Sequence, residues 1–340
     1  MLVRFEYRAL RAPFRHPVLT AHGTWTERES LFVRLTDDTG HAALGEIAPL
    51  PAWGSERLEQ AQAFCASLPP QFDEDVVRQI PAELPCCRFA FETAWDALRK
   101  PTAPVPVRAL PVAALLPAGP AAVEAARQAA VRGFGTMKWK VGVGAPEAEL
   151  ALLPQVLAVL PPSGRLRLDA NGAWDLATAR RWLEACAGQP VEFIEQPFPV
   201  GQEAPVLELA AAFPTRIALD ESVAQPADLH RWLEFGWPGI YVVKPALAGS
   251  PHQLLRLLES YEAEAVFSSA FETAVGARAA LLVAARADLR GHAVGFGTIG
   301  CFADARLNLP EPGPTLSTKW LARLPTSPLW DLSSPVPPAA

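Results

Sequence analysis

The sequence predicts an α/β protein built on a TIM-type barrel, with a smaller α+β domain in front of it. Eight short apolar runs rich in β-formers follow residue 105, and helical patterns separate them at about 24–29 residues per unit. This alternation is typical of a parallel sheet, and eight units are the number that closes a barrel. Charged residues also recur at the ends of successive runs, at the same interval. A doubly wound open sheet is the alternative, but no G-x-G-x-x-G sequence follows the first run.

The first hundred residues indicate antiparallel strands and helices. The stretch ESLFVRLTDDTGHAALGEIA (29–48) has two apolar runs joined by a polar turn, which predicts a β-hairpin. Helical periodicity follows in 55–68 and again in 87–100. The proline-rich segment 101–111 predicts a boundary, so we expect one domain over 1–104 and the barrel over 105–304.

The barrel strands are predicted from the apolar runs, and the helices from the patterns between them. In 175–186, apolar residues share one helical face, and in 250–262 Ser250 is placed to cap a helix. The eight expected strands are 111–117, 136–141, 165–170, 191–196, 216–221, 239–244, 264–269 and 292–297.

Composition limits the partners that we expect. The 340 residues carry a net charge of −6, with a pI near 5.6, which argues against nucleic acid and anionic membranes as partners. No apolar run is long enough to cross a membrane, and the N-terminus lacks the apolar segment of a signal peptide. The five scattered cysteines indicate reduced thiols. We therefore expect a soluble, cytoplasmic protein that acts on a small molecule.

Charged residues stand at the C-terminal ends of the second to sixth runs. Such residues converge on the mouth of a barrel, where barrel enzymes keep their active sites. One charged position per βα unit is unlike the scattered helix caps and solvated edges that single charges usually represent. The residues are Lys138, Lys140, Asp169, Glu195, Asp220, Glu221 and Lys244.

Three of these residues predict a metal site. Asp169, Glu195 and Asp220 follow consecutive strands, so their carboxylates would lie close together and repel one another. A hard divalent ion, Mg²⁺ or Mn²⁺, prefers such all-oxygen ligands and would neutralise their charge.

The lysines predict a reaction in which a proton is removed next to a carboxylate. Lys138 and Lys140 are two residues apart in a strand and point to the same face, so Lys138 disfavours protonation of Lys140. Lys140 can then act as a base. Lys244, from the sixth run, would face this pair across the mouth and stabilise the negative charge that develops.

The motifs KWK, LDANGAW, EFIEQPF, LDES and VVKP resemble those of the enolase superfamily, in its muconate-lactonising subgroup, and GEIAPLPAWGSE (45–56) resembles the signature of its capping domain. The resemblance implies a (β/α)₇β barrel under an α+β cap that the segment 305–340 completes. It implies Mg²⁺ on the three acids, Lys140 as base and then acid, and Lys244 as the facing cation. From SSAFET (268–273) and GFGT (295–298) it also implies substrate contacts. The further binding or supporting residues are Arg167, Asn171, Glu221, Ser268, Ser269, Gly297 and Thr298.

The resemblance leaves two enzymatic functions open, and a third function stays open beside them. The favoured one is a lyase of menaquinone or phylloquinone biosynthesis, which eliminates water from 2-succinyl-6-hydroxy-2,4-cyclohexadiene-1-carboxylate. The second is a racemase of N-succinylamino acids or a dipeptide epimerase, in which both lysines exchange protons. The third is a non-catalytic metal-binding barrel. We also expect 20–30 to be a loop that closes over the substrate; the oligomeric state stays open.

Overall fold

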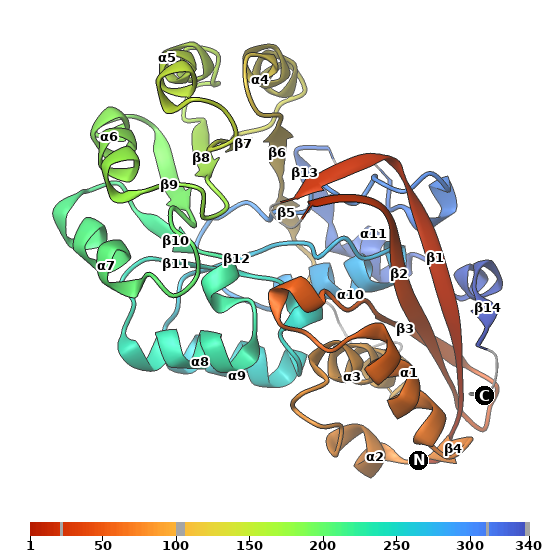
Figure 1. The fold of residues 1–340 in the computed structure, drawn as a ribbon. Coiled ribbons are helices and arrows are strands. Elements are labelled where there is room, and N and C mark those ends of the chain that lie inside the picture. Colours follow the sequence, from red (N-terminus) through yellow and green to blue (C-terminus); the bar gives the residue numbers. More distant parts are fainter. Residues whose placement is uncertain (21–22, 100–105, 311–312, 337–340) are drawn as a thin grey trace.

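An antiparallel sheet with helices precedes a parallel barrel in the computed structural model, which describes residues 1–20, 23–99, 106–310 and 313–336 (Figure 1). The antiparallel sheet has the order β14-β1-β2-β3, and β4 pairs with β1. Its strands are β1 (Val3–Thr20), β2 (Gly23–Thr36), β3 (Ala42–Ile47), β4 (Gln71–Phe72) and β14 (Ser334–Pro335). Its helices are α1 (Leu58–Ser67), α2 (Glu74–Arg78) and α3 (Pro85–Arg99).

The predicted hairpin in 29–48 is confirmed as β2 and β3. Asp37 closes the turn, because its carboxylate accepts hydrogen bonds from the backbone N–H groups of Thr39 and His41, both at 2.9 Å. Helix α3 packs across β3 and β2 through buried apolar residues such as Phe89 and Ala90. Gly45 is required in β3, since a Cβ atom there would lie 2.1 Å from the carbonyl oxygen of Ala90.

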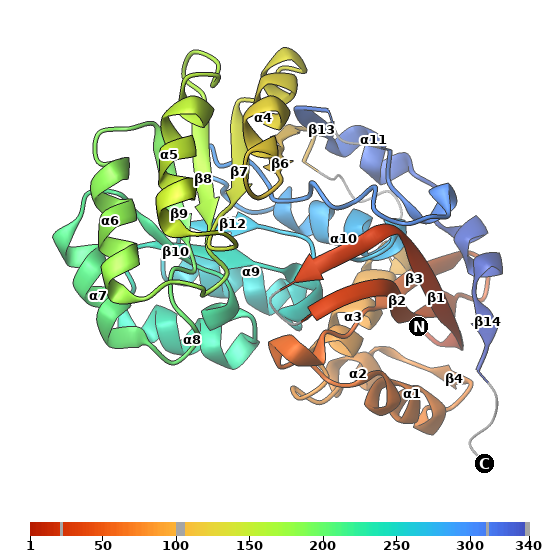
Figure 2. The same cartoon turned by 45° about the horizontal axis from the view of Figure 1, so that its top comes forward.

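The prediction of a loop over 20–30 is wrong for residues 23–30, which belong to β2. Residues 21–22 lie outside the described residues. The charges alternate with the strand period, so Glu27 and Glu29 pair with Arg11 of β1 at 2.7 and 3.1 Å, while Arg28 points to the opposite, buried side. Both ribbon views show this pair of strands reaching from the antiparallel sheet toward the barrel (Figures 1 and 2). A lid movement on ligand binding stays a prediction.

The barrel is a sheet of seven parallel strands in sequence order, with a helix after each strand. The strands are β6 (Ala113–Leu116), β7 (Thr136–Lys140), β8 (Arg165–Asp169), β9 (Val191–Glu195), β10 (Ile217–Leu219), β11 (Ile240–Val243) and β12 (Ala265–Phe267). The helices are α4 (Ala121–Val131), α5 (Pro146–Leu157), α6 (Leu176–Cys186), α7 (Glu203–Ala212), α8 (Pro226–Phe235), α9 (Pro251–Ser260) and α10 (Ala274–Ala284).

The expected eighth strand, 292–297, is reduced to two isolated parallel bridges, Val112 with Val294 and Ser268 with Gly295. It still closes the barrel, because Val294 accepts a hydrogen bond from Ala113 of β6 while the N–H of Gly295 donates to Phe267 of β12. Glycine is needed at 295, since a Cβ atom there would lie 2.8 Å from the Ser268 hydroxyl. The (β/α)₇β architecture predicted from the sequence is therefore confirmed.

Alternation within β7 points its lysines into the barrel. Met137 and Trp139 are fully buried on the outer face, where Trp139 meets Trp182 of α6 edge-on at 5.9 Å between ring centroids. Helix α6 begins at Asp175, whose carboxylate accepts from the N–H of Thr178 at 2.7 Å. The lysines between and after the two apolar residues of β7 must then face the interior of the barrel.

The C-terminal segment contacts both parts of the chain. Strand β13 (Thr315–Ser317) pairs with β5 (Ala109–Pro111), and α11 (Thr318–Arg323) packs on α10 of the barrel. Further on, Trp330 lies under Arg8 and Arg34, with cation–ring distances of 4.6 and 4.3 Å, and β14 pairs with β1. The boundary expected near residue 104 lies outside the described residues. The division of the chain into two domains stays a proposal; of the segment expected to complete the cap, 315–323 lies on the barrel side and β14 pairs with the cap.

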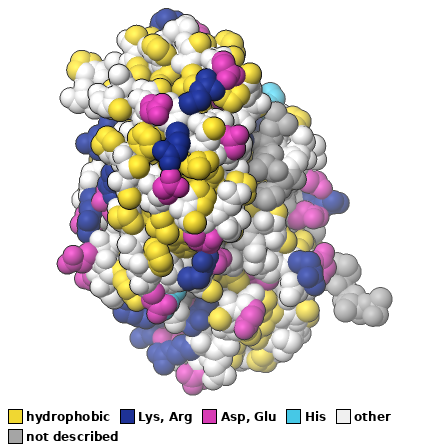
Figure 3. All heavy atoms as spheres, turned by 60° about the vertical axis from the view of Figure 1, so that its left-hand side comes forward, with side chains coloured by type: hydrophobic (Ala, Val, Ile, Leu, Met, Phe, Trp, Pro, Cys, Tyr) yellow, Lys and Arg dark blue, Asp and Glu magenta, His cyan; other side chains and the backbone are white. Residues whose placement is uncertain are grey.

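The face over the barrel helices carries interspersed acidic and basic side chains with apolar groups between them (Figure 3). This mixture differs from the continuous basic surface with which proteins bind nucleic acids. Within the described residues, none of the helices combines the length and the hydrophobicity needed to cross a lipid bilayer.

Candidate active site

A cavity of about 210 Å³ opens at the C-terminal ends of the barrel strands. Its lining is divided between charged and apolar groups. The polar lining residues are Lys138, Lys140, Asp169, Asn171, Asp220, Glu221, Lys244, Ser268, Ser269 and Thr298; the others are Trp53, Leu115, Leu116, Phe271 and Gly295.

Strand register brings the charged residues to one level. Lys140 pairs with Asp169, and Asp169 pairs with Glu195, across three adjacent strands. Asp220 and Lys244 lie one residue beyond β10 and β11, because these strands end slightly earlier than the expected runs 216–221 and 239–244. Because β8 to β10 lie between β7 and β11 in the sheet, the lysines flank the acids from both sides, as predicted.

Ammonium groups contact the three carboxylates. Lys138 Nζ lies 2.8 Å from Asp169 Oδ2 and 2.7 Å from Glu195 Oε1. Lys244 Nζ contacts Asp220 Oδ1 and also lies 4.0 Å from the ring centroid of Trp53. Trp53 comes from a 3₁₀ turn (Pro51–Trp53) that follows β3, so the N-terminal part of the chain supplies one wall of the cavity.

The electrostatics of the site are those of crowded acids. Burial, and then the charge of Asp169, raises the pKa of Glu195 well above its usual range. Burial, followed by the charges of Asp220 and Asp169, raises the pKa of Glu221 to about 7. Burial alone would lower the pKa of Lys138, but the neighbouring carboxylates raise it. The site therefore favours added positive charge.

The donor set fits a hard divalent cation. Asp169, Glu195 and Asp220 bring carboxylate oxygens from three neighbouring strand ends, and Glu221 Oε2 is a buried oxygen without a hydrogen-bond donor. Oxygen ligands of this kind suit Mg²⁺. Among the residues that the structure describes, no three acidic, imidazole or thiol side chains already stand in a metal-ligating arrangement; the oxygens instead face Lys138 and Lys244.

Most of the expected binding residues line the cavity. Asn171 donates from Nδ2 to Glu221 Oε1 at 3.2 Å, and Ser269 Oγ lies 2.7 Å from Thr298 Oγ1. Ser268 donates to the carbonyl of Gly295 at 3.0 Å. Gly297 does not line the cavity: a Cβ atom there would lie 2.6 Å from Leu115 Cγ, so this glycine makes room for the leucine that does.

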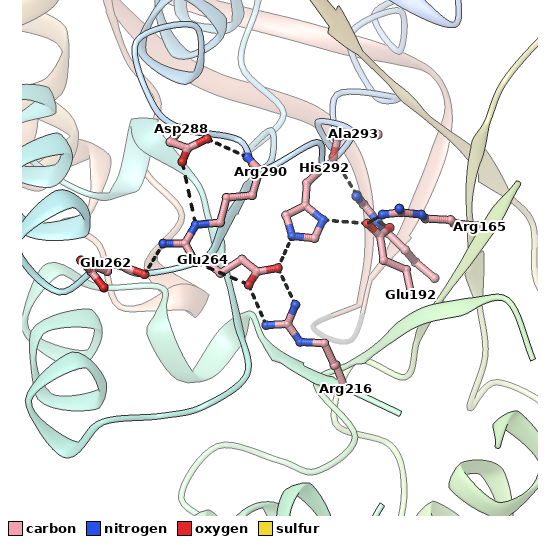
Figure 4. Close-up of polar contacts among 10 residues, drawn as sticks. Arg165, Glu192, Arg216, Glu262, Glu264, Asp288, Arg290, His292 and Ala293 are labelled. Atoms are coloured by element: carbon pink, nitrogen blue, oxygen red, sulfur yellow. Dashed lines mark hydrogen bonds and ion pairs between the residues drawn. The ribbon is translucent and has the colours of Figure 1, made fainter. Parts of the chain in front are cut away.

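The expected role of Arg167 beside the acids is wrong. Its guanidinium points away from the cavity, donating to Glu192 at 2.6 Å and to the carbonyl of Ala293 at 2.8 Å. Figure 4 shows the ion-pair network that this arginine joins at the other end of the strands. The ring nitrogens of His292 lie 2.6 Å from carboxylate oxygens of Glu192 and Glu264, which ties the closing segment to β9 and β12. Arg167 thus stabilises the closed barrel.

This network predicts a loss of stability in acid. Burial opposes ionisation of Glu192, but its hydrogen bond with His292 and the charge of Arg167 lower its pKa to about 2. Hydrogen bonds from Arg216 and His292 lower the pKa of Glu264 to about 2 as well. Because both pKa values are depressed in the folded protein, their contribution is complete above pH ~4.5 and is lost as the pH falls toward 2. It amounts to about 3 kcal/mol for Glu192 and to less for Glu264, whose charge is screened by solvent.

We expect the free energy of unfolding of Glu192→Gln, measured by urea titration, to depend less on pH between 4.5 and 2 than that of the wild type. The control is Glu184→Gln on the exposed side of α6, which should keep the wild-type dependence. Equal pH dependence in all three proteins would contradict this role of the network.

Three residues that sequence reasoning left without a role belong to the site. Gln196 accepts from the N–H groups of Asp220 and Ser222 at 3.0 and 3.2 Å, so it holds the turn that carries the third acid. Trp53 and Phe271 are aromatic walls of the cavity. The signals were present in EFIEQPF, GEIAPLPAWGSE and SSAFET, but only the partners of these side chains in space reveal what they do.

Comparisons with known proteins match both parts of the chain. Residues 121–299 match the family described as "Enolase C-terminal domain-like", and residues 5–98 match "MenC, N-terminal domain". An o-succinylbenzoate synthase of Thermosynechococcus vestitus is 44% identical over 300 residues, which are 87% of this chain and 92% of the relative.

The solved structures include a similar molecule with metal. The crystal structure of o-succinylbenzoate synthase from Thermosynechococcus elongatus BP-1, complexed with Mg in the active site, has a TM-score of 0.82 and 41% identity, covering 96% of this chain and 99% of that one. A hydrophobic dipeptide epimerase of Roseobacter litoralis is 30% identical over 67% of this chain and 71% of its own.

Proposed function

The chain belongs to the enolase superfamily, and from this premise we propose that it is a hydro-lyase with the activity of an o-succinylbenzoate synthase. The reaction is the syn-dehydration of 2-succinyl-6-hydroxy-2,4-cyclohexadiene-1-carboxylate to 2-succinylbenzoate, a step of menaquinone or phylloquinone biosynthesis. The substrate is a small carboxylate, which agrees with the size and charge of the cavity.

The observation that carries this proposal is the match of residues 5–98 to the MenC N-terminal domain together with the 44% identity. The N-terminal part places Trp53 in the cavity wall, so it contributes to substrate choice as well as to covering the barrel. The barrel residues alone would serve any reaction that begins with removal of a proton next to a carboxylate.

Asp169, Glu195 and Asp220 would hold Mg²⁺, and Mn²⁺ as a substitute stays a prediction. When bound, the ion supplies positive charge that polarises the substrate carboxylate and acidifies the adjacent C–H bond. Asn171 and Glu221, which are hydrogen-bonded to each other, would support these ligands from behind. Gln196 fixes the backbone of Asp220 and so the direction of its carboxylate.

Lys140 acts as the base and then as the acid. Its amine takes the proton from the carbon next to the carboxylate, and the C–H electron pair forms the new ring double bond. The C–O bond on the adjacent carbon breaks, and the same ammonium group returns the proton to the departing hydroxide, so that water leaves. A syn-elimination needs this proton transfer on one face only.

The other two lysines contribute fixed charge. Lys244 is buried beside Asp220 and under Trp53, which leaves it little freedom to move, and its ammonium group balances negative charge on the substrate. Lys138 bridges Asp169 and Glu195 and so holds two of the acids in place.

Epimerisation of a dipeptide or racemisation of an N-succinylamino acid is the second candidate, because an epimerase is 30% identical to this chain and the same lysines would serve. A non-catalytic barrel does not account for three lysines that line one cavity with Asp169 and Asp220. The test incubates the protein and Mg²⁺ with the cyclohexadiene substrate and follows its absorbance. Parallel samples of N-succinyl amino acids and dipeptides in D₂O report exchange of the α-proton. Exchange without dehydration would overturn the proposed function.

Trp53 offers a test of the cavity wall. We expect Trp53→Ala to lower kcat/KM for dehydration by a factor of about 2 to 30, which corresponds to the roughly 0.5–2 kcal/mol of a cation–π contact. Trp53→Phe keeps an aromatic face against Lys244 and should retain most of the activity. Equal losses in the two variants, measured by initial rates, would show that the ring face does not matter.

A further inference from the structure

We propose that three buried charged residues outside the cavity, Arg28, Glu46 and Glu272, position its aromatic walls and thereby set substrate affinity. We call them the buried clasp. All three are almost completely inaccessible to solvent. None of them lines the cavity, so they act on the substrate only through other residues. The inference rests on the proposed function, and these three residues have no part in the proposed reaction itself.

Glu46 of β3 holds the start of barrel helix α10. Its carboxylate accepts from the backbone N–H of Thr273 at 3.0 Å, from the Thr273 hydroxyl at 2.6 Å and from the N–H of Gly276 at 2.9 Å. A Cβ atom at Gly276 would lie 2.9 Å from Glu46 Oε2, so glycine is needed for this approach. A carboxylate at a helix N-terminus is electrostatically favourable, and here it comes from a distant part of the chain.

The segment held in this way is the one that turns into the cavity. Phe271, three residues after Ser268, has a left-handed backbone with a φ of 59°, which is strained for an aromatic residue. Its ring lies 5.8 Å from that of Trp25 and 6.0 Å from that of Phe14, between the β1–β2 ribbon and the cavity. Such a conformation persists only where its surroundings impose it.

Glu272 is the second restraint on this turn. Its Oε2 atom accepts from the N–H of Ala270 at 2.9 Å, while Oε1 is buried without a hydrogen-bond donor. Burial raises the pKa of Glu272 to about 7, and the charge of Glu46 acts in the same direction. The other groups close enough to act on this pair electrostatically are Arg28 of β2 and the thiol of Cys301.

Arg28 connects the clasp to the second aromatic wall. Its guanidinium donates to the carbonyls of Ala48 and Pro49 at 2.5 and 2.6 Å, just before the turn that carries Trp53. The charge of Arg28 also faces Glu46 and Glu272. One buried group of charges therefore supports Phe271 on one side of the cavity and Trp53 on the other.

The test compares Glu46→Gln and Glu272→Gln with the wild type. In Glu46→Gln an amide NH₂ group replaces one acceptor oxygen and meets the N–H donors of α10. We expect KM for the cyclohexadiene substrate to rise on the order of ten-fold, with kcat changed less than about three-fold. Deuterium exchange of the amides in 268–276 should also accelerate. Glu56→Gln is the control, because this equally buried carboxylate accepts from Cys86 and Cys87 instead.

Glu272→Gln should behave differently. Its amide keeps an oxygen for Ala270 and cannot ionise, so KM should stay near the wild-type value at pH 6. Above pH 7 the wild-type KM should rise as Glu272 ionises against Glu46, and that of Glu272→Gln should rise less.

Unchanged KM and unchanged exchange in folded Glu46→Gln, or an equal rise of KM in Glu56→Gln, would overturn the clasp. So would a fall of kcat with constant KM. A wild-type protein that neither dehydrates the cyclohexadiene substrate nor exchanges the α-proton of the amino-acid substrates would overturn the proposed function instead. Deuterium exchange of the backbone amides in 268–276 would still test the clasp.

Discussion

Lys140→Ala is expected to reduce dehydration by a factor of about 10⁴ or more, because it removes the group that we propose both takes and returns the proton. Lys140 lies at the end of β7, level with Asp169 of β8, and lines the cavity.

Lys244→Arg is the informative partner of this variant. Arginine keeps the positive charge but does not deprotonate in proteins. If Lys244 contributes only charge, Lys244→Arg should keep measurable dehydration, reduced by the poorer fit of a guanidinium between Asp220 and Trp53. A racemase or epimerase needs a proton from the second face, so on those substrates Lys244→Arg should lose as much as Lys140→Ala.

The measurement is turnover of both variants on the cyclohexadiene substrate, with circular dichroism to show that they are folded. Equal and complete loss in both would contradict proton transfer on one face. Activity retained in Lys140→Ala would contradict the role of Lys140 itself, and the base would have to be sought elsewhere in the cavity.

Periodic features were predictable from the sequence, and the reasons are local. Alternation in TMKWK placed both lysines of β7 on one face, and the spacing of charges by one βα unit placed them at one end of the barrel. The strands lie in sequence order because short connections keep consecutive elements next to each other. These rules need no knowledge of distant partners.

Features that depend on distant partners were not predictable. Arg167 shares the face of Asp169, but two residues along a strand are about 6–7 Å apart, and its partner Glu192 lies at a register shift between β8 and β9. Residues 20–30 were expected to form a loop over the substrate, whereas Glu27 and Glu29 pair with Arg11 of β1 within two paired strands. Trp53 contacts Lys244, which lies 191 positions later in the sequence (244 − 53), and no sequence pattern predicts such a contact.

Substitution of the three proposed metal ligands should have the second large effect. Asp169→Asn, Glu195→Gln and Asp220→Asn are each expected to abolish turnover. The loss of Mg²⁺ affinity should exceed the roughly 10–100-fold that accompanies changes to the partners of metal ligands. Each substitution removes negative charge from a buried group of acids without changing its shape much, so circular dichroism should show a retained fold. Prolonged treatment with EDTA should abolish turnover in the wild type, and Mg²⁺ should restore it.

The matched control is Asp288→Asn, the same chemical change at an exposed carboxylate by the ion-pair network at the other end of the barrel (Figure 4). It should leave both Mg²⁺ binding, measured by titration calorimetry, and turnover unchanged. Full activity after exhaustive chelation would contradict the proposed requirement for Mg²⁺. If Glu195→Gln still binds Mg²⁺, Glu195 is not one of the ligands. Its buried position would then be explained by the ion pair with Lys138 alone. If all three variants lose binding together, a single ion accounts for the crowding of their carboxylates.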